Sequence, residues 1–298
     1  MKAPTIFINI LSLASLYLAV SCNEEEQHDQ TVSTILATIE QSSTRTALDD
    51  PDADGVYKTI WSSDDAIAVF SGSNAASEFK LTSGANTNTA EFEGNAASDN
   101  MVAIYPYSIV KGRTGSTISV TLPEVQEYVS GNIPQGAYPM AAVSDGAVLP
   151  FYNLCSVLRL RMFGELTVKS ITFTPNDATV KTSGNATVNA GDKMLTMSGD
   201  AKSTVRLNCA NGVKLTRTST DFLMVVPAQK YTGGFTITIS TDQGAVVKAV
   251  KSDVTLSRSV LYPIKAFECK IEQSKDNIVF EDANFKAYMI KNFDTDGD

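Results

Sequence analysis

The side chains that most often catalyse reactions or bind metal ions are thinly spread along this chain of 298 residues. Its one histidine, His28, lies near the N-terminus. The rest of the chain therefore cannot assemble a Ser-His-Asp or Cys-His arrangement, or a zinc site with histidine ligands. The acidic residues form no recognisable catalytic pair. The sequence indicates a protein that is not an enzyme and that needs no cofactor.

Cys22 is the residue whose surroundings indicate chemistry most clearly. A mostly apolar run from Ile6 to Val20 ends in small residues directly before this cysteine. The run is shorter than the stretch of about 20 residues that crosses a bilayer, and its pattern is that of a signal peptide over residues 1–21. The five residues that end at Cys22 resemble the bacterial lipobox, which implies cleavage before Cys22 and lipidation of its thiol. An ordinary secretory signal with an incidental cysteine is the alternative.

Three glutamates, Glu24, Glu25 and Glu26, follow within an acidic tether over residues 22–30. They resemble the export signal that sends Bacteroidetes lipoproteins to the outer face of the outer membrane. The resemblance implies a surface lipoprotein whose partner is the outer membrane. Two or three acyl chains, such as palmitate, hold a protein firmly at about 0.8 kcal/mol per buried CH₂. A charged, solvated tether is the simpler interpretation of the same residues.

Net charge and cysteine spacing exclude further classes of protein. The net charge is -9 and the pI is about 4.7, whereas proteins that bind nucleic acid or anionic lipid need clustered Lys and Arg. Cys155, Cys209 and Cys269 are too widely spaced to resemble a disulfide scaffold, and we expect Cys155 and Cys209 to be buried thiols. A disulfide between two of them remains open.

From residue 31 to about 272 the chain consists of short alternating runs divided by turn residues. Ile118, Val120 and Leu122 alternate with polar residues, and the run from Phe235 to Thr241 does the same. Such runs predict strands with one buried face, whereas the wholly apolar run from Phe222 to Pro227 predicts a strand buried on both faces. We predict an all-β protein with two sandwich domains, at 31–147 and 148–272.

The order of several short blocks carries a family resemblance. They include "TRT" at 44–46, "IWSSDDAIAVF", "AIYPYS", "VTLPEVQEY" and "FLMVVPAQKYTGGFTITISTDQG". Over roughly residues 30–270 this order resembles the fimbrillin-like (Mfa-like) lipoproteins of Bacteroidales. The resemblance implies two tandem transthyretin-like β-sandwich domains, a lipidated precursor and a place on the cell surface, in pili or in adhesive structures associated with them.

The resemblance leads to three functional hypotheses. The first is a surface lipoprotein of the outer membrane that adheres to host or bacterial surface ligands or displays a further domain. The second is a pilus subunit or pilus anchor that assembles with other fimbrial subunits by donor-strand exchange. The third is a glycan-binding accessory lipoprotein in which Tyr105 and Tyr107 stack on sugars.

Strand exchange would involve a removable N-terminal strand. The segment with Val32, Ile35, Leu36 and Ile39 is the candidate, and Arg45 behind it is a candidate cleavage site. An arginine in an exposed turn is the simpler interpretation of that residue. Trp61, close behind, is expected to anchor a core rather than to bind a ligand.

The C-terminal residues 273–298 predict a linker and the start of a further unit. A short helix is expected from about Asp282, and the segment resembles the opening of bacterial leucine-rich-repeat surface proteins. Asp294, Asp296 and Asp298 have the 1-3-5 spacing of a calcium loop but lack its glycine and its glutamate, so no metal site is complete. The earlier acidic run at 50–55 is expected to be a turn, because its twelfth position is Trp61.

Overall fold

The structure is a computed structural model that describes residues 32–40, 59–72, 75–95 and 100–271. Within these ranges every regular element is a strand, except for the short 3₁₀ turn η1 at Tyr107–Ile109. The predicted all-β class is therefore confirmed. The predicted C-terminal helix lies outside the described residues. The assignment to tandem transthyretin-like sandwiches stays a prediction.

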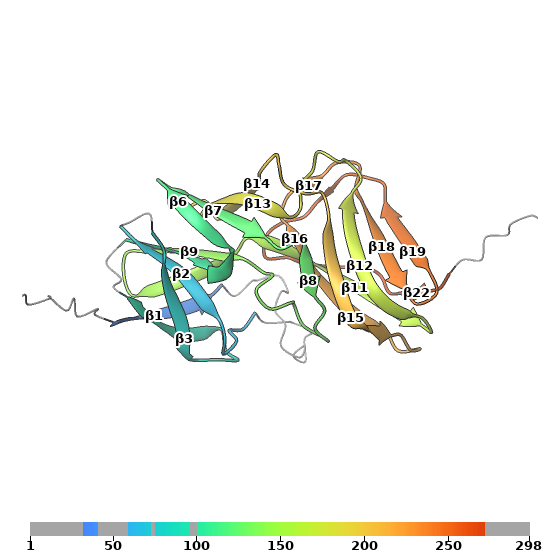
Figure 1. The fold of residues 1–298 in the computed structure, drawn as a ribbon, viewed down its shortest axis with the longest axis horizontal. Helices are drawn as coiled ribbons and strands as arrows, with labels where there is room; N and C mark the ends of the chain where they lie inside the picture. Colours follow the sequence, from blue (N-terminus) through green and yellow to red (C-terminus); the bar gives the residue numbers. More distant parts are fainter. Residues whose placement is uncertain (1–31, 41–58, 73–74, 96–99, 272–298) are drawn as a thin grey trace, which may run out of the picture. The chain divides into compact units, whose positions relative to one another are not determined.

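The N-terminal part of the chain forms a closed barrel in the order β1-β10-β9-β5-β2-β3-β4 (Figure 1). Its strands are β1 (Val32–Ile39), β2 (Ala66–Ser71), β3 (Ser77–Ser83), β4 (Thr89–Asn95), β5 (Met101–Tyr105), β9 (Met140–Ser144) and β10 (Val148–Asn153). Alternating apolar side chains fill its interior around Trp61, which is 1% exposed. The indole ring makes edge-to-face contacts with Phe92, Tyr105 and Phe151 at centroid distances of 5.0, 5.5 and 5.4 Å. The prediction that Trp61 anchors a core is confirmed.

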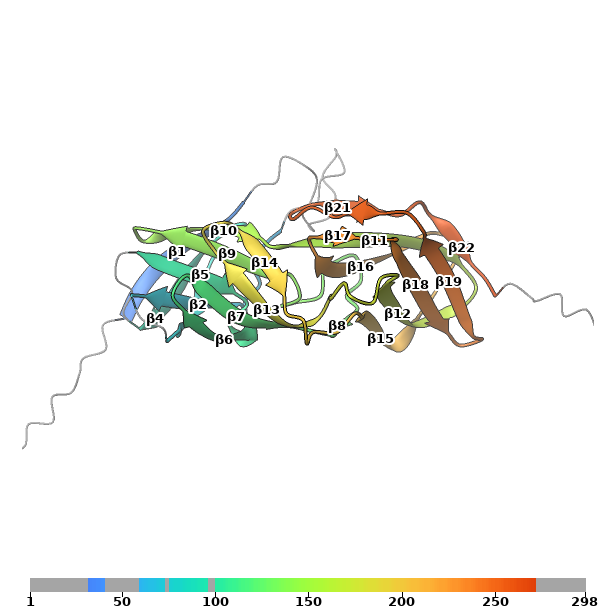
Figure 2. The same ribbon diagram turned by 90° about the horizontal axis from the view of Figure 1, so that it is seen from above.

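A four-stranded sheet in the order β14-β13-β7-β6 combines strands that are far apart in the sequence (Figure 2). Its strands are β6 (Val110–Thr114), β7 (Thr117–Leu122), β13 (Gly184–Asn189) and β14 (Met194–Met197). The predicted alternation is confirmed in β7, where Ile118, Val120 and Leu122 are buried. These side chains join a core cluster with residues of β2, β11 and β16.

The remaining strands form two further sheets and a small ribbon around one core cluster. The five-stranded sheet, in the order β19-β18-β12-β15-β8, contains β8 (Val125–Glu127), β12 (Thr167–Pro175), β15 (Val205–Lys214), β18 (Phe235–Thr241) and β19 (Ala245–Val250). The four-stranded sheet contains β11 (Cys155–Gly164), β16 (Thr220–Pro227), β21 (Leu261–Pro263) and β22 (Phe267–Cys269). The ribbon pairs β17 (Lys230–Tyr231) with β20 (Val254–Thr255). In β16, residues 222–227 are all buried, as their apolar sequence predicts.

Strand pairing connects the two parts of the chain that the sequence divides at 147/148. β7 pairs with β13 and β8 pairs with β15, while β10 lies in the barrel between β1 and β9. The side-chain amide of Gln126 adds a further connection, because it donates to the carbonyl of Val225 at 2.8 Å and accepts from its N–H at 3.0 Å. The predicted domain bounds themselves stay a prediction.

The three cysteines in the described part of the chain are free and buried. Burial raises the pKa of the Cys155 and Cys269 thiols above the ordinary value, and it raises that of Cys209 to about 11. A thiol with a raised pKa carries little thiolate at neutral pH and is a poor nucleophile. These cysteines therefore act as small apolar core residues, as the sequence predicts for Cys155 and Cys209.

Candidate functional site

β1 is the strand on which the predicted strand exchange depends, and it closes the barrel between β10 and β4. It runs parallel to β10, with Leu36 opposite Val148, and antiparallel to β4, with Ile35 opposite Phe92. Ile35, Ala37 and Ile39 point into the core with 1%, 0% and 4% of their surface exposed. Figure 1 draws this strand in blue.

The structure divides the predicted residues of β1 between its two faces. Ile35 and Ile39 are buried, whereas Val32 and Leu36 are 66% and 37% exposed. The side-chain period of two explains this division, because residues 35, 37 and 39 share one face. Ala37, which was not among the predicted residues, lies between Ile35 and Ile39 on this face and is 0% exposed.

The end of β1 is fastened by a polar cluster that we call the Glu40 latch, formed by Glu40, Asn153 and Arg258. The N–H of Glu40 donates to the carbonyl of Phe151 at 2.8 Å. Its carboxylate Oε1 accepts from Asn153 N–H at 3.0 Å and from Arg258 Nη1 at 2.8 Å. The side chains of Glu40 and Arg258 are only 16% and 34% exposed. Partial burial strengthens such a charge-assisted pair.

Removal of β1 would open a groove between β4 and β10. Removal would take two buried isoleucines out of the core, and burial of each contributes roughly 1.5–3 kcal/mol to the free energy of unfolding. It would also leave the facing backbone groups of β4 and β10 without their strand partner, which makes both strands edges that attract another strand. The groove suits an extended segment with large, small and large apolar residues at alternate positions, as in Ile35, Ala37 and Ile39.

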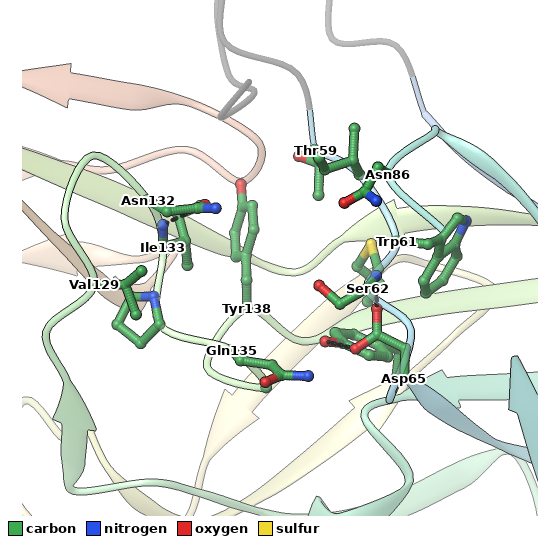
Figure 3. A pocket seen from close by; sticks show the side chains of 15 residues that line it. Thr59, Trp61, Ser62, Asp65, Asn86, Val129, Asn132, Ile133, Gln135 and Tyr138 are labelled. Carbon is green, nitrogen blue, oxygen red and sulfur yellow. Dashed lines mark hydrogen bonds between the residues drawn. The ribbon is translucent and has the colours of Figure 1, made fainter. Parts of the chain in front are cut away.

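A pocket of about 270 Å³ lies beside Trp61 (Figure 3). The segment before β2, the turn between β3 and β4, and the loop from residue 129 to residue 138 contribute its lining. Ser62, Asn132 and Gln135 provide polar side chains, and Tyr138 stands opposite Trp61. This pocket was not predicted from the sequence, because its residues come from segments about 25 to 80 positions apart.

Asp65 fixes the floor of this pocket. Its carboxylate accepts from Ser62 N–H at 2.7 Å and from the Tyr105 hydroxyl at 2.8 Å, and Asp65 is only 5% exposed. Burial raises the pKa of the Asp65 carboxyl above its ordinary value, although these hydrogen bonds and one from Gln135 oppose the shift. Burial and the Asp65 charge together raise the pKa of Tyr105. Tyr105 therefore stays protonated and donates to Asp65.

Other predicted site residues lie outside the described ranges. These are Cys22, Glu24, Glu25, Glu26, Arg45, Asp294, Asp296 and Asp298. In the described ranges, the His, Cys, Asp and Glu side chains form no group of three that could hold a metal ion. The same ranges contain no helix that is long and apolar enough to span a bilayer.

Comparison with known proteins finds similarity at the level of structure. No protein-family model matches the sequence, and no curated protein matches it. A solved structure from Bacteroides ovatus, of a protein assigned to cell adhesion, has a TM-score of 0.50 and 11% identity and covers 80% of this chain and 92% of its own. At this identity the likeness concerns the fold alone, and it agrees with the all-β architecture.

Two further solved structures have lower TM-scores. One, also of a protein assigned to cell adhesion, is from Bacteroides uniformis, with a TM-score of 0.44, 16% identity, and coverage of 80% of this chain and 94% of its own. The other is a fimbrial protein from Bacteroides vulgatus, with a TM-score of 0.39, 10% identity, and coverage of 79% and 95%.

Proposed function

We propose that this chain is a fimbrillin-like surface protein that serves in adhesion and is held at the outer membrane by a lipid on Cys22. The spacing between the anchor and the fold carries the proposal: β1 begins at Val32, ten residues after Cys22. The fold shared with the Bacteroides ovatus protein supports the assignment to adhesion. In this proposal the protein has no catalytic activity.

Metabolic labelling with radioactive palmitate tests the anchor. We expect the wild-type protein to incorporate the label, because a lipidated Cys22 carries acyl chains. The Cys22→Ala variant should incorporate none. The matched control is Cys209→Ala, which removes a buried thiol of the fold and should leave labelling unchanged. Equal labelling of wild type and Cys22→Ala would disprove the anchor.

Strand exchange at β1 is the second candidate function, and the position of β1 favours it. A strand at the N-terminal edge of the fold completes the barrel, and the predicted cleavage site Arg45 follows it in the sequence. After cleavage, β1 would be held only by noncovalent contacts, and a strand from another subunit would compete for the groove. The chain would then be a pilus subunit or a pilus anchor.

Cleavage with an arginine-specific protease tests this candidate. We expect cleavage after Arg45, release of β1 and a ladder of higher assemblies on gels. Arg45→Lys keeps the positive charge but removes the cleavage site, so this variant should stay monomeric. A labelled peptide of residues 32–40 should enter the emptied groove, whereas a peptide with Ala37→Phe should not, since Ala37 is 0% exposed. A cleaved protein that remains monomeric and takes up neither peptide would contradict strand exchange.

The third hypothesis, glycan binding through Tyr105 and Tyr107, is not supported in that form. Tyr105 is only 8% exposed, and its hydroxyl donates to Asp65 in the barrel. The ring lies edge-to-face against Trp61 and cannot present a face to a sugar from solvent. Tyr107, in η1, would have to act without it.

A further inference from the structure

Residues 209–212 form a bulge in β15. Asn208 lies opposite Ser170 of β12, and Val213 lies opposite Val168. Four residues of β15 therefore stand opposite a single residue of β12. On the other side of β15, the pairing with β8 ends at Asn208. Within the described strands, residues 209–212 thus have no partner in the register, and the ladder does not fix their backbone.

The bulge contains Asn211 followed by Gly212, which is the only Asn-Gly sequence in the chain. In such a sequence the backbone nitrogen of the glycine can attack the side-chain amide carbon of the asparagine. A larger residue would hinder this approach with its side chain, whereas glycine has none. The sequence therefore places an electrophile and a nucleophile next to each other at a point where the ladder is interrupted.

The amide of Asn211 is free to turn toward this nitrogen. Its side chain is exposed and makes no hydrogen bond with the described part of the chain. Other asparagines are held, because Asn208 Nδ2 donates to Glu127 at 2.8 Å and Asn185 Nδ2 donates to Asp200 at 3.0 Å. A held amide must first break its hydrogen bond, whereas Asn211 needs no such step.

The surroundings of Gly212 favour the attack. Ala210 and Gly212 have positive φ angles of 36° and 91°, so the chain turns at Asn211 and is not extended there. Lys169 Nζ lies 2.9 Å from the point that a Cβ atom on Gly212 would occupy. An ammonium group at this position stabilises the negative charge that develops on the attacking nitrogen and on the amide oxygen.

We propose that Asn211 is a site of spontaneous deamidation in the folded protein. The Gly212 nitrogen gives its proton to hydroxide and forms a bond to Cγ of Asn211. The bond from Cγ to Nδ2 breaks, and the leaving nitrogen takes a proton from water and departs as ammonia. The five-membered succinimide ring then takes up water at either of its carbonyl groups and opens to aspartate or isoaspartate. The net reaction consumes one water and releases one ammonia.

The product changes the surface of the bulge without breaking the sandwich. A new carboxylate next to Lys169 adds one negative charge to the net charge of -9. Isoaspartate also adds one carbon atom to the main chain, at a place where no register pair is lost. We therefore expect the modified protein to stay folded. The proposal rests on neither the lipid anchor nor strand exchange, since it uses residues of the bulge and its neighbour alone.

Mass spectrometry of the folded protein tests the proposal. The full chain, purified in detergent, is incubated at pH 7 and at pH 9 and digested with trypsin at mildly acidic pH. The peptide of residues 207–214 is then sequenced by fragmentation. We expect a gain of about 1 Da at Asn211, faster at pH 9 because more hydroxide is present, and none at Asn208 in the same peptide. Isoaspartate methyltransferase should label this peptide.

Two variants connect the reaction to the bulge. Asn211→Gln would require a six-membered ring and should show no gain in mass. Lys169→Gln removes the ammonium group and should slow conversion roughly fivefold, the equivalent of about 1 kcal/mol for two charges in water. Lys251→Gln, at an exposed lysine after β19, is the matched control and should convert as wild type does. Circular dichroism shows whether each variant is folded.

A sample unfolded in urea is run beside the folded protein and shows that the assay detects conversion. The proposal is overturned if Asn211 keeps its mass in the folded protein at pH 9, because the fold would then protect it. Conversion of Asn208 at the same rate would also overturn it, since the bulge would then have no part in the reaction. An unchanged rate in folded Lys169→Gln would overturn the role of the ammonium group.

Discussion

At the scale of single residues, buried polar side chains determine the geometry around the barrel core. Asp65 is placed so that Ser62 and Tyr105 both donate to its carboxylate. Local sequence predicts the turn at Ser62–Asp65, because Asp and Ser favour such turns. It does not predict Tyr105 as the partner, which lies 40 positions further along the chain.

The pH dependence of stability follows from the raised pKa of Asp65. Because the folded-state pKa lies above the ordinary value of 3.8, the folded protein binds this proton more tightly than the unfolded chain does. The contribution of Asp65 to the free energy of unfolding is therefore fully present below pH 3.8 and is lost as the pH rises through the folded pKa. A carbon-detected NMR titration should show the Asp65 carboxyl titrating above 3.8, and titration below this value would contradict the assignment.

Tyr105→Phe removes the hydroxyl that donates to Asp65. We expect the pKa of Asp65 to rise further, because a group that stabilises the carboxylate is lost. The variant should lose about 1–2 kcal/mol of unfolding free energy in urea at pH 7, and less at a pH below the Asp65 pKa, where the carboxyl is protonated. Tyr107→Phe is the matched control. Equal losses at both pH values would show that the hydrogen bond to the carboxylate is not the cause.

At the scale of elements, β1 is both part of the core and accessible at its outer face. The period of two in its sequence predicts a strand, and Ile35 and Ile39 are buried as a strand requires. The sequence does not predict its neighbours, β4 and β10, because many strands of this chain share the same alternation. The sequence does not predict the Glu40 latch either, since Glu40 and Arg258 are 218 positions apart.

Arg258→Gln tests how firmly the latch holds β1. The Glu40 side chain is only 16% exposed, and the substitution removes the positive charge next to its carboxylate. We expect the free energy of unfolding to fall by about 1–3 kcal/mol. Hydrogen exchange of the β1 amides should become faster than in wild type, while exchange in β18 stays unchanged. Lys230→Gln, which breaks the more exposed pair with Asp253, is the control and should leave β1 exchange unchanged. Unchanged exchange of β1 in Arg258→Gln would mean that the latch does not retain the strand.

At the scale of the whole molecule, local patterns predict the all-β class but not how the sheets connect. The alternation in residues 117–122 predicts β7 correctly. Its pairing with β13, about 65 positions away, depends on long-range packing that a local pattern does not contain. Local patterns do not predict the pocket beside Trp61 for the same reason, because the segments that line it become neighbours only in the folded chain.

Surface display of the whole protein is the central claim, and antibody labelling of intact cells measures it most directly. An antibody against the described β-domains should label intact cells that express the wild-type protein. Cells that express Cys22→Ala should lose this labelling, because the protein is no longer anchored, although the same antibody should still detect the protein in the periplasm or the medium. Labelling of wild-type cells only after permeabilisation, or undiminished surface labelling of the Cys22→Ala cells, would contradict the account.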